Sequence, residues 1–333
     1  MANKKIKVLL IRFSSFGDIT QCLSVPSRLK EITPSPEVHW VTREDFTSLL
    51  AGHPAIDKIW TLNRKLGLTG LFSLIWALRK EHFTHIYDAH NNLRSHLIAW
   101  LLNPQELLRK SQKRFLRFLL FQLRINKFEQ PFSGQRDLLE PLTEWGLSKE
   151  LPATPQIYIS AESKKTAQKL LGPWLEKPFV TIAASAAFPL KRWPVEHWKE
   201  LLKMDPRPFV LLGGPEDQFL GELAAIAPER ILNLAGRCSL GESAAVIDLS
   251  AALVANDTGL LHVAEQLGKN CIALMGPAPF GFPSRKSTRI LQLDLACRPC
   301  SKHGQGPCVN SKFQRCLVDI SPTQVKAELA AKA

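Results

Sequence analysis

The chain has 333 residues and a formal net charge of +13, with 45% hydrophobic and 22% charged residues. This length accommodates two domains that each bury a core. No apolar run reaches the roughly 18–20 residues that span a bilayer, and the N-terminus lacks the apolar region of a signal peptide. Seven cysteines, an odd number in so long a chain, do not resemble the disulfide framework of a small secreted protein. We therefore expect a cytoplasmic globular protein.

The chain begins with a predicted strand, Lys5–Ile11, followed by a serine- and glycine-containing turn and an amphipathic helix that ends near residue 31. The turn carries Ser15, Gly17 and one carboxylate, Asp18. Its single glycine does not match the G-x-G-x-x-G fingerprint of dinucleotide sites, and no Gly-Lys-Ser/Thr of a Walker loop follows. Considered alone, Asp18 is best interpreted as a helix cap.

Short β-like runs alternate with helical patterns through the rest of the first half. This alternation predicts an α/β fold with a parallel sheet. The expected strands are Glu37–Val41, Lys58–Thr61 and His85–Asp88, and the expected helices are Phe46–Ala51, Leu68–Glu81, Arg94–Leu102 and Leu138–Trp145.

A basic stretch, Arg109–Lys127, interrupts this alternation. It interleaves cations, among them Arg114 and Arg117, with Phe and Leu, as a basic amphipathic helix does. Such a helix suits an anionic membrane surface or an anionic amphiphile. Nucleic acid is the competing partner of a basic surface, but no helix-turn-helix, zinc-finger or RNP signature accompanies the stretch, so no nucleic acid is expected. The remaining alternative is a solvated charged face whose Phe and Leu pack inward.

A proline-containing link at residues 151–159 precedes a second α/β series. Its expected strands are Phe179–Ala183, Phe209–Leu212, Ile231–Asn233, Ala252–Ala255 and Cys271–Met275, with helices near Val195–Leu202, Asp217–Ala227, Ser243–Ser250 and Leu260–Leu267. We place one domain at 1–158 and a second at 159–320, with a helix in 321–333 as a candidate strap that returns to the first domain. Ligands are expected where strand carboxyl ends face a cleft between the two domains.

Two polar loops follow the first strands of the second series. In one loop, Ser185, Lys191 and Arg192 could contact an anionic diphosphate. The alternative is a cationic surface loop held in place by a packed Trp193. In the other loop, Glu216 could accept hydrogen bonds from ribose hydroxyls. The alternative is a simple turn in which Glu216 or Asp217 caps the helix that follows.

The most informative segment is 251–268, where a buried strand ends at Asp257 and a helix begins at Thr258. The free N–H groups and positive dipole of a helix N-terminus favour an anion such as phosphate. Gly259 permits close approach of a ligand to the backbone, and His262 lies one turn further along the same face. The alternative is an ordinary capped helix with His262 on its rim.

Four cysteines near the C-terminus have the spacing C-x2-C-x7-C-x7-C. Four thiolates could close a tetrahedral zinc site, although the second pair lacks the C-x-x-C spacing of a zinc ribbon. Reduced thiols packed under a loop are the alternative, and both interpretations stay open. The four residues are Cys297, Cys300, Cys308 and Cys316.

In combination, these segments resemble glycosyltransferase family 9, the lipopolysaccharide heptosyltransferases, over essentially the whole chain. The resemblance rests on the order and spacing of Arg12–Asp18, Lys191–Pro194, Asn256–Gly259 with His262, and the cysteine cluster. It implies a GT-B architecture, in which two Rossmann-like parallel-sheet domains, N-terminal for the acceptor and C-terminal for the donor, face each other across a cleft.

The resemblance further implies that heptose moves from ADP-heptose to the lipopolysaccharide inner core with inversion, without a bound metal or other cofactor. Asp18, flanked by Ser15 and Gly17, matches the general base. Lys191 matches the cation beside the diphosphate. The other implied donor-site residues are Ser185, Arg192, Glu216, Asp257, Thr258, Gly259, His262 and, at the adenine pocket, Cys238.

The implied acceptor is an anionic glycolipid, which Arg114 and Arg117 would contact at the inner membrane surface. Two departures from the family pattern stand out: Ser185 is followed by two alanines where relatives often carry polar side chains, and no Gly-His lies between the last two cysteines. The alternatives are the same fold with another nucleotide sugar or acceptor, a nicotinamide-dependent oxidoreductase, which the missing fingerprint disfavours, and a non-catalytic basic binding protein.

Overall fold

The computed structural model describes residues 5–331 and divides into two compact units. Unit 1 comprises the residues up to Lys113 together with Gln135–Tyr158, and unit 2 comprises Arg114–Gly134 and the residues from Ile159 onward. The segment 114–134, which the sequence analysis places in the first domain, therefore belongs to unit 2. No helix within the described residues is both long and apolar enough to cross a membrane.

Unit 1 contains a parallel five-stranded sheet in the order β3-β2-β1-β4-β5. The strands carry aliphatic or aromatic side chains in their centres, and the side chains of the middle strand β1 are almost completely buried. The strands are β1 (Lys7–Ile11), β2 (Glu37–Arg43), β3 (Lys58–Leu62), β4 (His85–Asp88) and β5 (Glu106–Arg109).

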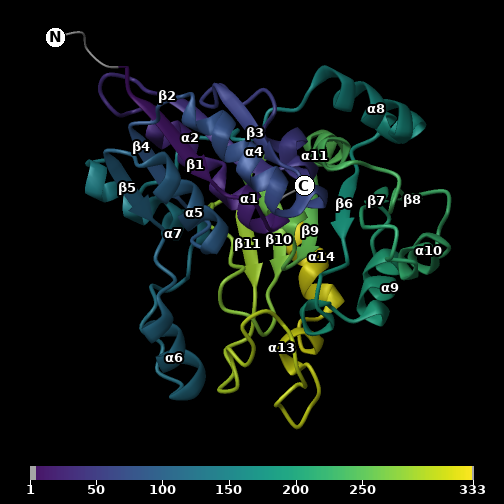
Figure 1. Cartoon of the computed structure of the whole chain (residues 1–333). Helices are drawn as coiled ribbons and strands as arrows, with labels where there is room; N and C mark the ends of the chain where they lie inside the picture. Colours follow the sequence, from purple (N-terminus) through teal and green to yellow (C-terminus); the bar gives the residue numbers. More distant parts are fainter. Residues whose placement is uncertain (1–4, 332–333) are drawn as a thin grey trace. The chain divides into compact units, whose positions relative to one another are not determined.

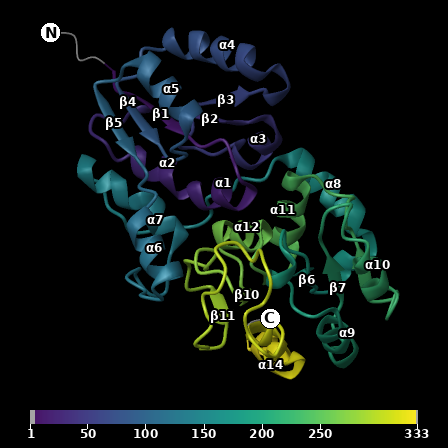
Figure 2. The same cartoon turned by 60° about the horizontal axis from the view of Figure 1, so that its bottom comes forward.

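Helices cover both faces of this sheet (Figure 2). Leu9 and Ile11 of β1 pack with α4 and α5 in one core, and Figure 2 shows α1 and α2 along the other face. The helices of unit 1 are α1 (Phe16–Cys22), α2 (Ser24–Leu29), α3 (Thr47–Leu50), α4 (Gly67–Arg79), α5 (Leu93–Leu102) and α7 (Gly134–Leu139), with 3-10 turns at Glu44–Phe46, Arg64–Leu66 and Glu140–Trp145.

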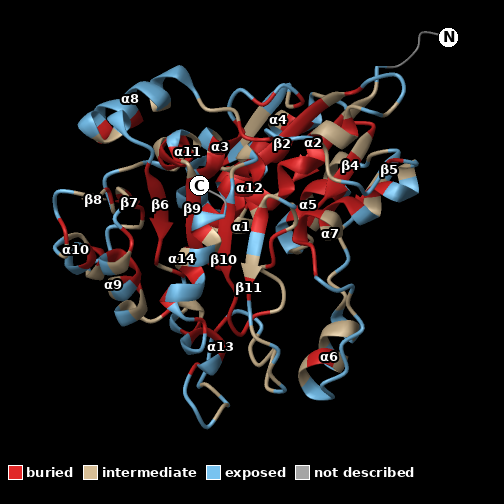
Figure 3. Ribbon diagram, turned by 180° about the vertical axis from the view of Figure 1, so that it is seen from behind, coloured by how far each residue is buried: buried red, intermediate tan, exposed pale blue. Residues whose placement is uncertain are grey.

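Unit 2 contains a parallel six-stranded sheet in the order β11-β10-β9-β6-β7-β8 (Figure 1). Both faces of the central strands are buried (Figure 3), as expected for a parallel sheet covered by helices. The strands are β6 (Val180–Ala183), β7 (Phe209–Leu211), β8 (Ile231–Asn233), β9 (Ala252–Asn256), β10 (Cys271–Leu274) and β11 (Thr288–Leu291).

The main core of unit 2 lies between this sheet and α9, α10, α13 and α14. Val325 and Leu329 of α14 are fully buried in that core. The C-terminal helix, which the sequence suggested as a strap, therefore packs into the core of unit 2. The helices are α6 (Arg114–Gln122), α8 (Ala161–Leu171), α9 (Val195–Met204), α10 (Phe219–Ala224), α11 (Leu240–Leu249), α12 (Gly259–Leu267), α13 (Arg315–Val318) and α14 (Pro322–Ala330), with 3-10 turns at Gly172–Glu176 and Pro189–Lys191.

The segment 114–134 joins unit 2 through aromatic packing. The rings of Phe121, Phe128 and Phe132 each meet Phe280 edge to face, with centroids 6.2, 5.1 and 5.1 Å apart. Arg124 Nη1 also donates to the carbonyl of Pro299 at 2.6 Å. These contacts explain why a segment that precedes Gln135 in sequence belongs to the second compact unit.

Candidate active site

The strand order reverses beside the first strand of each unit. In unit 1 the chain passes outward from β1 to β2 and β3, and then from β4 to β5 on the other side. In unit 2 it passes from β6 to β7 and β8, and then from β9 to β11. Ligands of open parallel sheets bind at the strand carboxyl ends beside such a reversal. The loops after β1, β4, β6 and β9 are therefore the candidate ligand-binding loops.

Asp18 lies on the loop after β1, in the first turn of α1. Ser15 is the N-cap of this helix, and its N–H and hydroxyl donate to Asp18 Oδ2 at 3.2 and 2.9 Å. Arg12 Nη2 lies 2.6 Å from the same oxygen. Gly17 precedes Asp18 in the same turn. These contacts confirm the capping interpretation, yet they all use one carboxylate oxygen.

The second oxygen of Asp18 accepts no hydrogen bond from any described residue, and its side chain is 48% exposed. Burial alone would raise the pKa of Asp18, but the Arg12 guanidinium and the hydrogen bonds from Ser15 outweigh burial and lower this pKa below the ordinary 3.8. The carboxylate is thus ionised at neutral pH, held in one orientation, and able to accept a proton at Oδ1.

The loop after β4 borders Asp18 in unit 1. Arg12 Nη1 donates to the carbonyl of Ala89 at 2.6 Å, which ties the two loops together. The His90 ring packs edge to face on Phe13 with centroids 4.9 Å apart. Burial and the nearby Arg12 lower the pKa of His90 to about 4, so the imidazole is neutral near pH 7. Sequence analysis missed this histidine, since it becomes a neighbour of Asp18 only through the pairing of β1 with β4.

In unit 2 the loops after β6 and β9 are joined by a buried ion pair. Lys191 Nζ lies 2.6 Å from Asp257 Oδ2, and both side chains are largely buried. Asn256 holds the same two loops together, since its amide accepts from Trp193 N–H at 3.1 Å and donates to the carbonyl of Ala184 at 2.5 Å. The two charged residues singled out from sequence are thus direct neighbours.

The helix after β9 begins without a side-chain cap. Thr258 is its N-cap in extended geometry and makes no capping hydrogen bond, and Gly259 is its first residue. The N–H groups of Gly259 and Leu260 can therefore face an anion, whereas the Leu261 N–H donates to the carbonyl of Thr258 at 3.2 Å. His262, in contrast, is buried with Nδ1 3.4 Å from Glu265 Oε2. Because the His262 ring is buried, its contact with the ligand expected at Thr258 stays a prediction.

Asp217 links the neighbouring loops of unit 2. Its Oδ1 accepts from Ser185 Oγ at 2.5 Å, and its Oδ2 accepts from the N–H of Gly214 at 2.8 Å. Ser185 therefore orients a buried carboxylate in this structure and does not project freely. Sequence analysis considered Asp217 only as a helix cap, because its bond to Ser185 depends on the β6–β7 pairing.

The remaining donor-site candidates lie on the same edge of the sheet. Arg192 Nε donates to the carbonyl of Ala186 at 2.8 Å and so shapes its own loop, while Glu216 is exposed on the loop after β7. Cys238 is half-buried after β8, where burial and Glu242 raise the pKa of its thiol to about 11. A neutral thiol is suited to an apolar ligand surface.

The two predicted acceptor cations have different environments on α6. Arg114 is exposed in its first turn. The Arg117 guanidinium lies over the Phe280 ring, 4.7 Å from its centroid, so it contributes to docking α6 on unit 2. Phe115 and Phe118 remain 69% and 53% exposed, which shows that α6 does not pack all of its apolar side chains inward.

One acidic group in unit 1 has the spacing of a cation site, namely Glu37, His39 and Glu81. Lys7 and Lys58 already contact the carboxylate of Glu81 at 2.7 Å each and lower its pKa to about 2. Glu37 begins β2, so this cluster lies at the amino ends of the strands. It is an ion-pair network away from the candidate ligand-binding loops.

Two units that each contain a parallel sheet, with polar residues gathered at the strand carboxyl ends, match the architecture of the GT-B class of glycosyltransferases. Within that class, residues 71–309 match the model of glycosyltransferase family 9 (heptosyltransferase). This match covers more than half of the chain, so the protein belongs to glycosyltransferase family 9.

Individual relatives agree with this assignment. Lipooligosaccharide heptosyltransferase 2 of Haemophilus ducreyi is 28% identical and covers 97% of this chain and 98% of its own length. The solved structure of E. coli ADP-heptose lps heptosyltransferase II has a TM-score of 0.76 at 23% identity, covering 98% of each chain. E. coli heptosyltransferase WaaC with ADP has a TM-score of 0.71 at 19% identity and covers 98% of this chain and 100% of its own.

Proposed function

We propose that this protein transfers heptose from ADP-heptose to the inner core of lipopolysaccharide, with inversion at the anomeric carbon. The observation that carries the proposal is the Lys191–Asp257 pair beside the uncapped N-terminus of α12, at the strand reversal of unit 2. Family membership supports the transfer class, and the printed names of the relatives supply heptose, ADP and lipopolysaccharide as the substrates of those proteins.

In unit 2, the proposed donor site follows the sheet edge from β9 to β8. The diphosphate contacts the amides of Thr258 and Gly259 and the ammonium of Lys191, where helix dipole and cation favour negative charge. Asp257 orients Lys191 from the other side. The ribose is expected at Glu216 and the adenine at Cys238, because their loops lie next along the sheet.

In unit 1, Asp18 acts as the proposed general base. Its Oδ1 accepts the proton of the attacking acceptor hydroxyl while Oδ2 stays fixed by Arg12 and Ser15. The acceptor oxygen forms a bond to the anomeric carbon as the bond from that carbon to the diphosphate oxygen breaks on the opposite side. The products are the inverted glycoside, ADP and a protonated Asp18, which returns its proton to solvent. One positioned base supplies about 10²–10⁴ in rate.

We further propose that the enzyme works at the cytoplasmic face of the inner membrane. In unit 2, α6 combines exposed Phe115 and Phe118 with the exposed cation Arg114. In unit 1, Phe72 and Trp76 are exposed one turn apart on α4. Aromatic side chains beside cations are the pattern of helices that lie in an anionic lipid interface.

Binding of nucleotides to the purified protein tests the donor assignment. ADP, UDP, GDP, CMP and NAD are compared at matched concentrations by thermal shift, since a ligand at 100 times its Kd stabilises a protein by about 2.7 kcal/mol. We expect selective stabilisation by ADP. Preference for UDP or GDP would indicate a donor sugar linked to that nucleotide on the same fold. Stabilisation by NAD alone would contradict the transferase proposal.

A further inference from the structure

We propose that the loop between β10 and β11, residues 275–287, positions the Lys191–Asp257 pair, and that Phe280 fixes this loop on segment 114–134. Phe280 thus acts as a positioning residue for the donor diphosphate. The inference rests on the proposed function, because it takes the Lys191–Asp257 pair as the contact of that diphosphate. The loop, the segment and the pair all belong to unit 2.

The loop lies directly against the residues of the pair. A Cβ at Gly281 would overlap the carboxylate of Asp257, so this carboxylate occupies the space that any side chain at position 281 would need. A Cβ at Gly276 would lie 3.2 Å from the carbonyl oxygen of Leu190, the residue before Lys191. Glycine permits such close approach of a backbone to another group. A shift of the loop would therefore displace Asp257 and change the position of the Lys191 ammonium.

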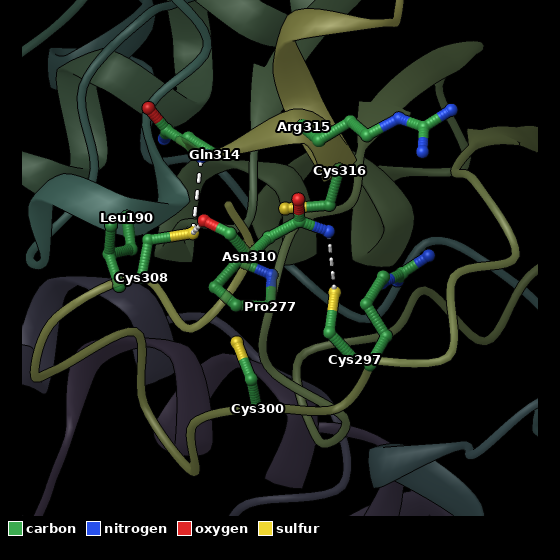
Figure 4. A pocket seen from close by; sticks show the side chains of 10 residues that line it. Leu190, Pro277, Cys297, Cys300, Cys308, Asn310, Gln314, Arg315 and Cys316 are labelled. Carbon is green, nitrogen blue, oxygen red and sulfur yellow. Dashed lines mark hydrogen bonds between the residues drawn. The ribbon is translucent and has the colours of Figure 1, made fainter. Parts of the chain in front are cut away.

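Hydrogen bonds fix the start of the loop. Arg298 Nε donates to the carbonyl of Gly276 at 2.9 Å, and Cys300 N–H donates to the carbonyl of Pro277 at 3.3 Å. Pro277 also lines a small cavity together with Leu190 and the four cysteines of the C-terminal cluster (Figure 4). The first residues of the loop are therefore held by the chain that follows β11.

The carboxylate of Glu265 fixes the other end of the loop. Glu265 lies on α12 and is fully buried, and its Oε1 accepts from the N–H groups of Ser284 and Arg285 at 2.7 Å each. Loss of these donors would leave a buried carboxylate poorly satisfied, which is costly. Because α12 begins two residues after Asp257, the end of the loop and the proposed diphosphate site are fixed to the same helix.

The middle of the loop is held from outside by segment 114–134. The ring of Phe280 meets three aromatic rings of this segment edge to face, those of Phe121, Phe128 and Phe132. The Arg117 guanidinium lies over the same ring, and Ser133 Oγ donates to Ser284 Oγ at 2.8 Å. Edge-to-face rings and a cation over a ring stabilise a contact beyond the burial of its area. Phe280 is therefore the main point at which the segment holds the loop.

The loop has room to move once the contacts of Phe280 are removed. A cavity of about 470 Å³ is lined by both segments, with Asn126 and Gln130 from the outer segment and Ala278 and Pro279 from the loop. Packed interiors contain few voids larger than a water molecule, so the two segments are not packed along their whole length. Loss of the Phe280 ring is thus expected to let the loop shift.

Phe280→Ala in the full chain tests the proposal. Without nucleotide, hydrogen–deuterium exchange of the amides in 256–262 should be faster than in the wild type. In calorimetric titrations, affinity for ADP should fall about 10-fold, as for the loss of one charge-assisted contact, and affinity for AMP should fall less. Trp174→Ala removes a partly exposed aromatic ring from the turn before β6 of the same unit and should change neither measurement. Phe280→Leu keeps the apolar volume without the ring and gives the same readings if the alanine variant does not fold.

Gly281→Ala disturbs the pair without altering segment 114–134. Its Cβ would force the Asp257 carboxylate to move, so the ratio of ADP affinity to AMP affinity should fall as in Phe280→Ala. Gly221→Ala is the matched variant, because a Cβ at Gly221 meets nothing within 4 Å, and it should keep the wild-type ratio.

The exchange measurement separates this inference from the proposed function. A wild-type protein that binds no ADP would contradict the donor assignment, whereas faster exchange at 256–262 in Phe280→Ala would still support the positioning role of Phe280. Wild-type exchange at 256–262 in Phe280→Ala would overturn that role. An unchanged ADP-to-AMP affinity ratio in this variant, in a protein whose wild type binds ADP, would overturn it as well.

Discussion

Asp18 is the side chain with the most specific proposed role. Asp18→Asn keeps the hydrogen-bonding shape of the turn but removes the acceptor for the hydroxyl proton, so turnover should fall about 10²–10⁴-fold with ADP affinity nearly unchanged. Transfer assays and calorimetric ADP titration measure the two effects. Asp45→Asn, an exposed carboxylate of the same unit, serves as the control. A parallel loss of ADP affinity would contradict the role of Asp18 as base.

Lys191 is expected to recognise the diphosphate. Lys191→Ala should weaken binding of ADP more than binding of AMP, because AMP lacks the second phosphate. The variant also leaves the buried Asp257 carboxylate without its cation, so its melting temperature should fall. The ADP-to-AMP affinity ratio separates recognition from folding, and an unchanged ratio would remove Lys191 from the donor site. Lys199→Ala, which removes a partly exposed cation of α9 paired with Glu196, should change neither.

The lowered pKa of His90 leads to a prediction of how the free energy of unfolding depends on pH. Its pKa is about 4 in the folded protein against 6.5 in an ordinary environment, so the unfolded chain binds the proton more readily. The stabilising contribution is therefore complete above pH 6.5 and is lost as the pH falls toward 4. Denaturant unfolding at several pH values should show a weaker acid dependence for His90→Phe. An identical pH dependence of unfolding in the wild-type protein and in His90→Phe would contradict the lowered pKa of His90.

Helix α6 illustrates how far an element could be predicted. The alternation of cations with Phe and Leu predicted a basic amphipathic helix, and the structure contains one at Arg114–Gln122. Its membership in unit 2 could not be predicted, since that depends on Phe280, which is distant in sequence. The same limit applies to β5 and β11, which are short strands at the sheet edges and mix buried with exposed residues.

Membrane contact through α6 is tested by sedimentation with anionic vesicles. Arg114→Glu combined with Phe118→Ser should reduce binding, because it removes a cation and an exposed aromatic ring. Lys164→Glu with Lys165→Glu reverses two exposed charges on α8 of the same unit, where no exposed aromatic ring accompanies them, and should have a smaller effect. Equal losses in both variants would indicate nonspecific charge attraction.

The predicted helix after β1 was also only partly correct. A single helix to about residue 31 was expected, but the chain forms α1 and α2, which meet at Leu23. Pro26 has no N–H with which to continue the hydrogen-bond ladder of α1. Strands β2, β3, β4 and β6 to β10 were predicted to within a few residues, because buried parallel strands are marked by strongly apolar runs.

For the molecule as a whole, the alternation of strands and helices along the chain predicted two parallel sheets. The structure contains both sheets, and the match to the family agrees with that architecture. What sequence could not supply is the strand order within each sheet, which places the loop of Asp18 beside that of His90 and the loop of Lys191 beside that of Asp257. These pairings form between residues far apart in the chain, so they cannot be predicted from local sequence patterns.

The net charge of +13 gives a further expectation for the intact protein. Binding to anionic vesicles should weaken as salt rises, since the Debye length shrinks from about 10 Å at 0.1 M to 3 Å at 1 M. A residual binding at high salt is expected from the exposed aromatic side chains of α4 and α6. Binding that is insensitive to salt would contradict an electrostatic contribution from the basic surface.

The most direct test of the account is a transfer assay with ADP-heptose and a purified inner-core glycolipid that lacks the heptose to be added. Mass spectrometry follows the acceptor, and wild-type protein is compared with Asp18→Asn. We predict that the wild-type acceptor gains one heptose with release of ADP, and that the variant yields at least about 10²-fold less product. Absence of product from a wild-type protein that binds ADP, or equal product from the variant, would contradict the account.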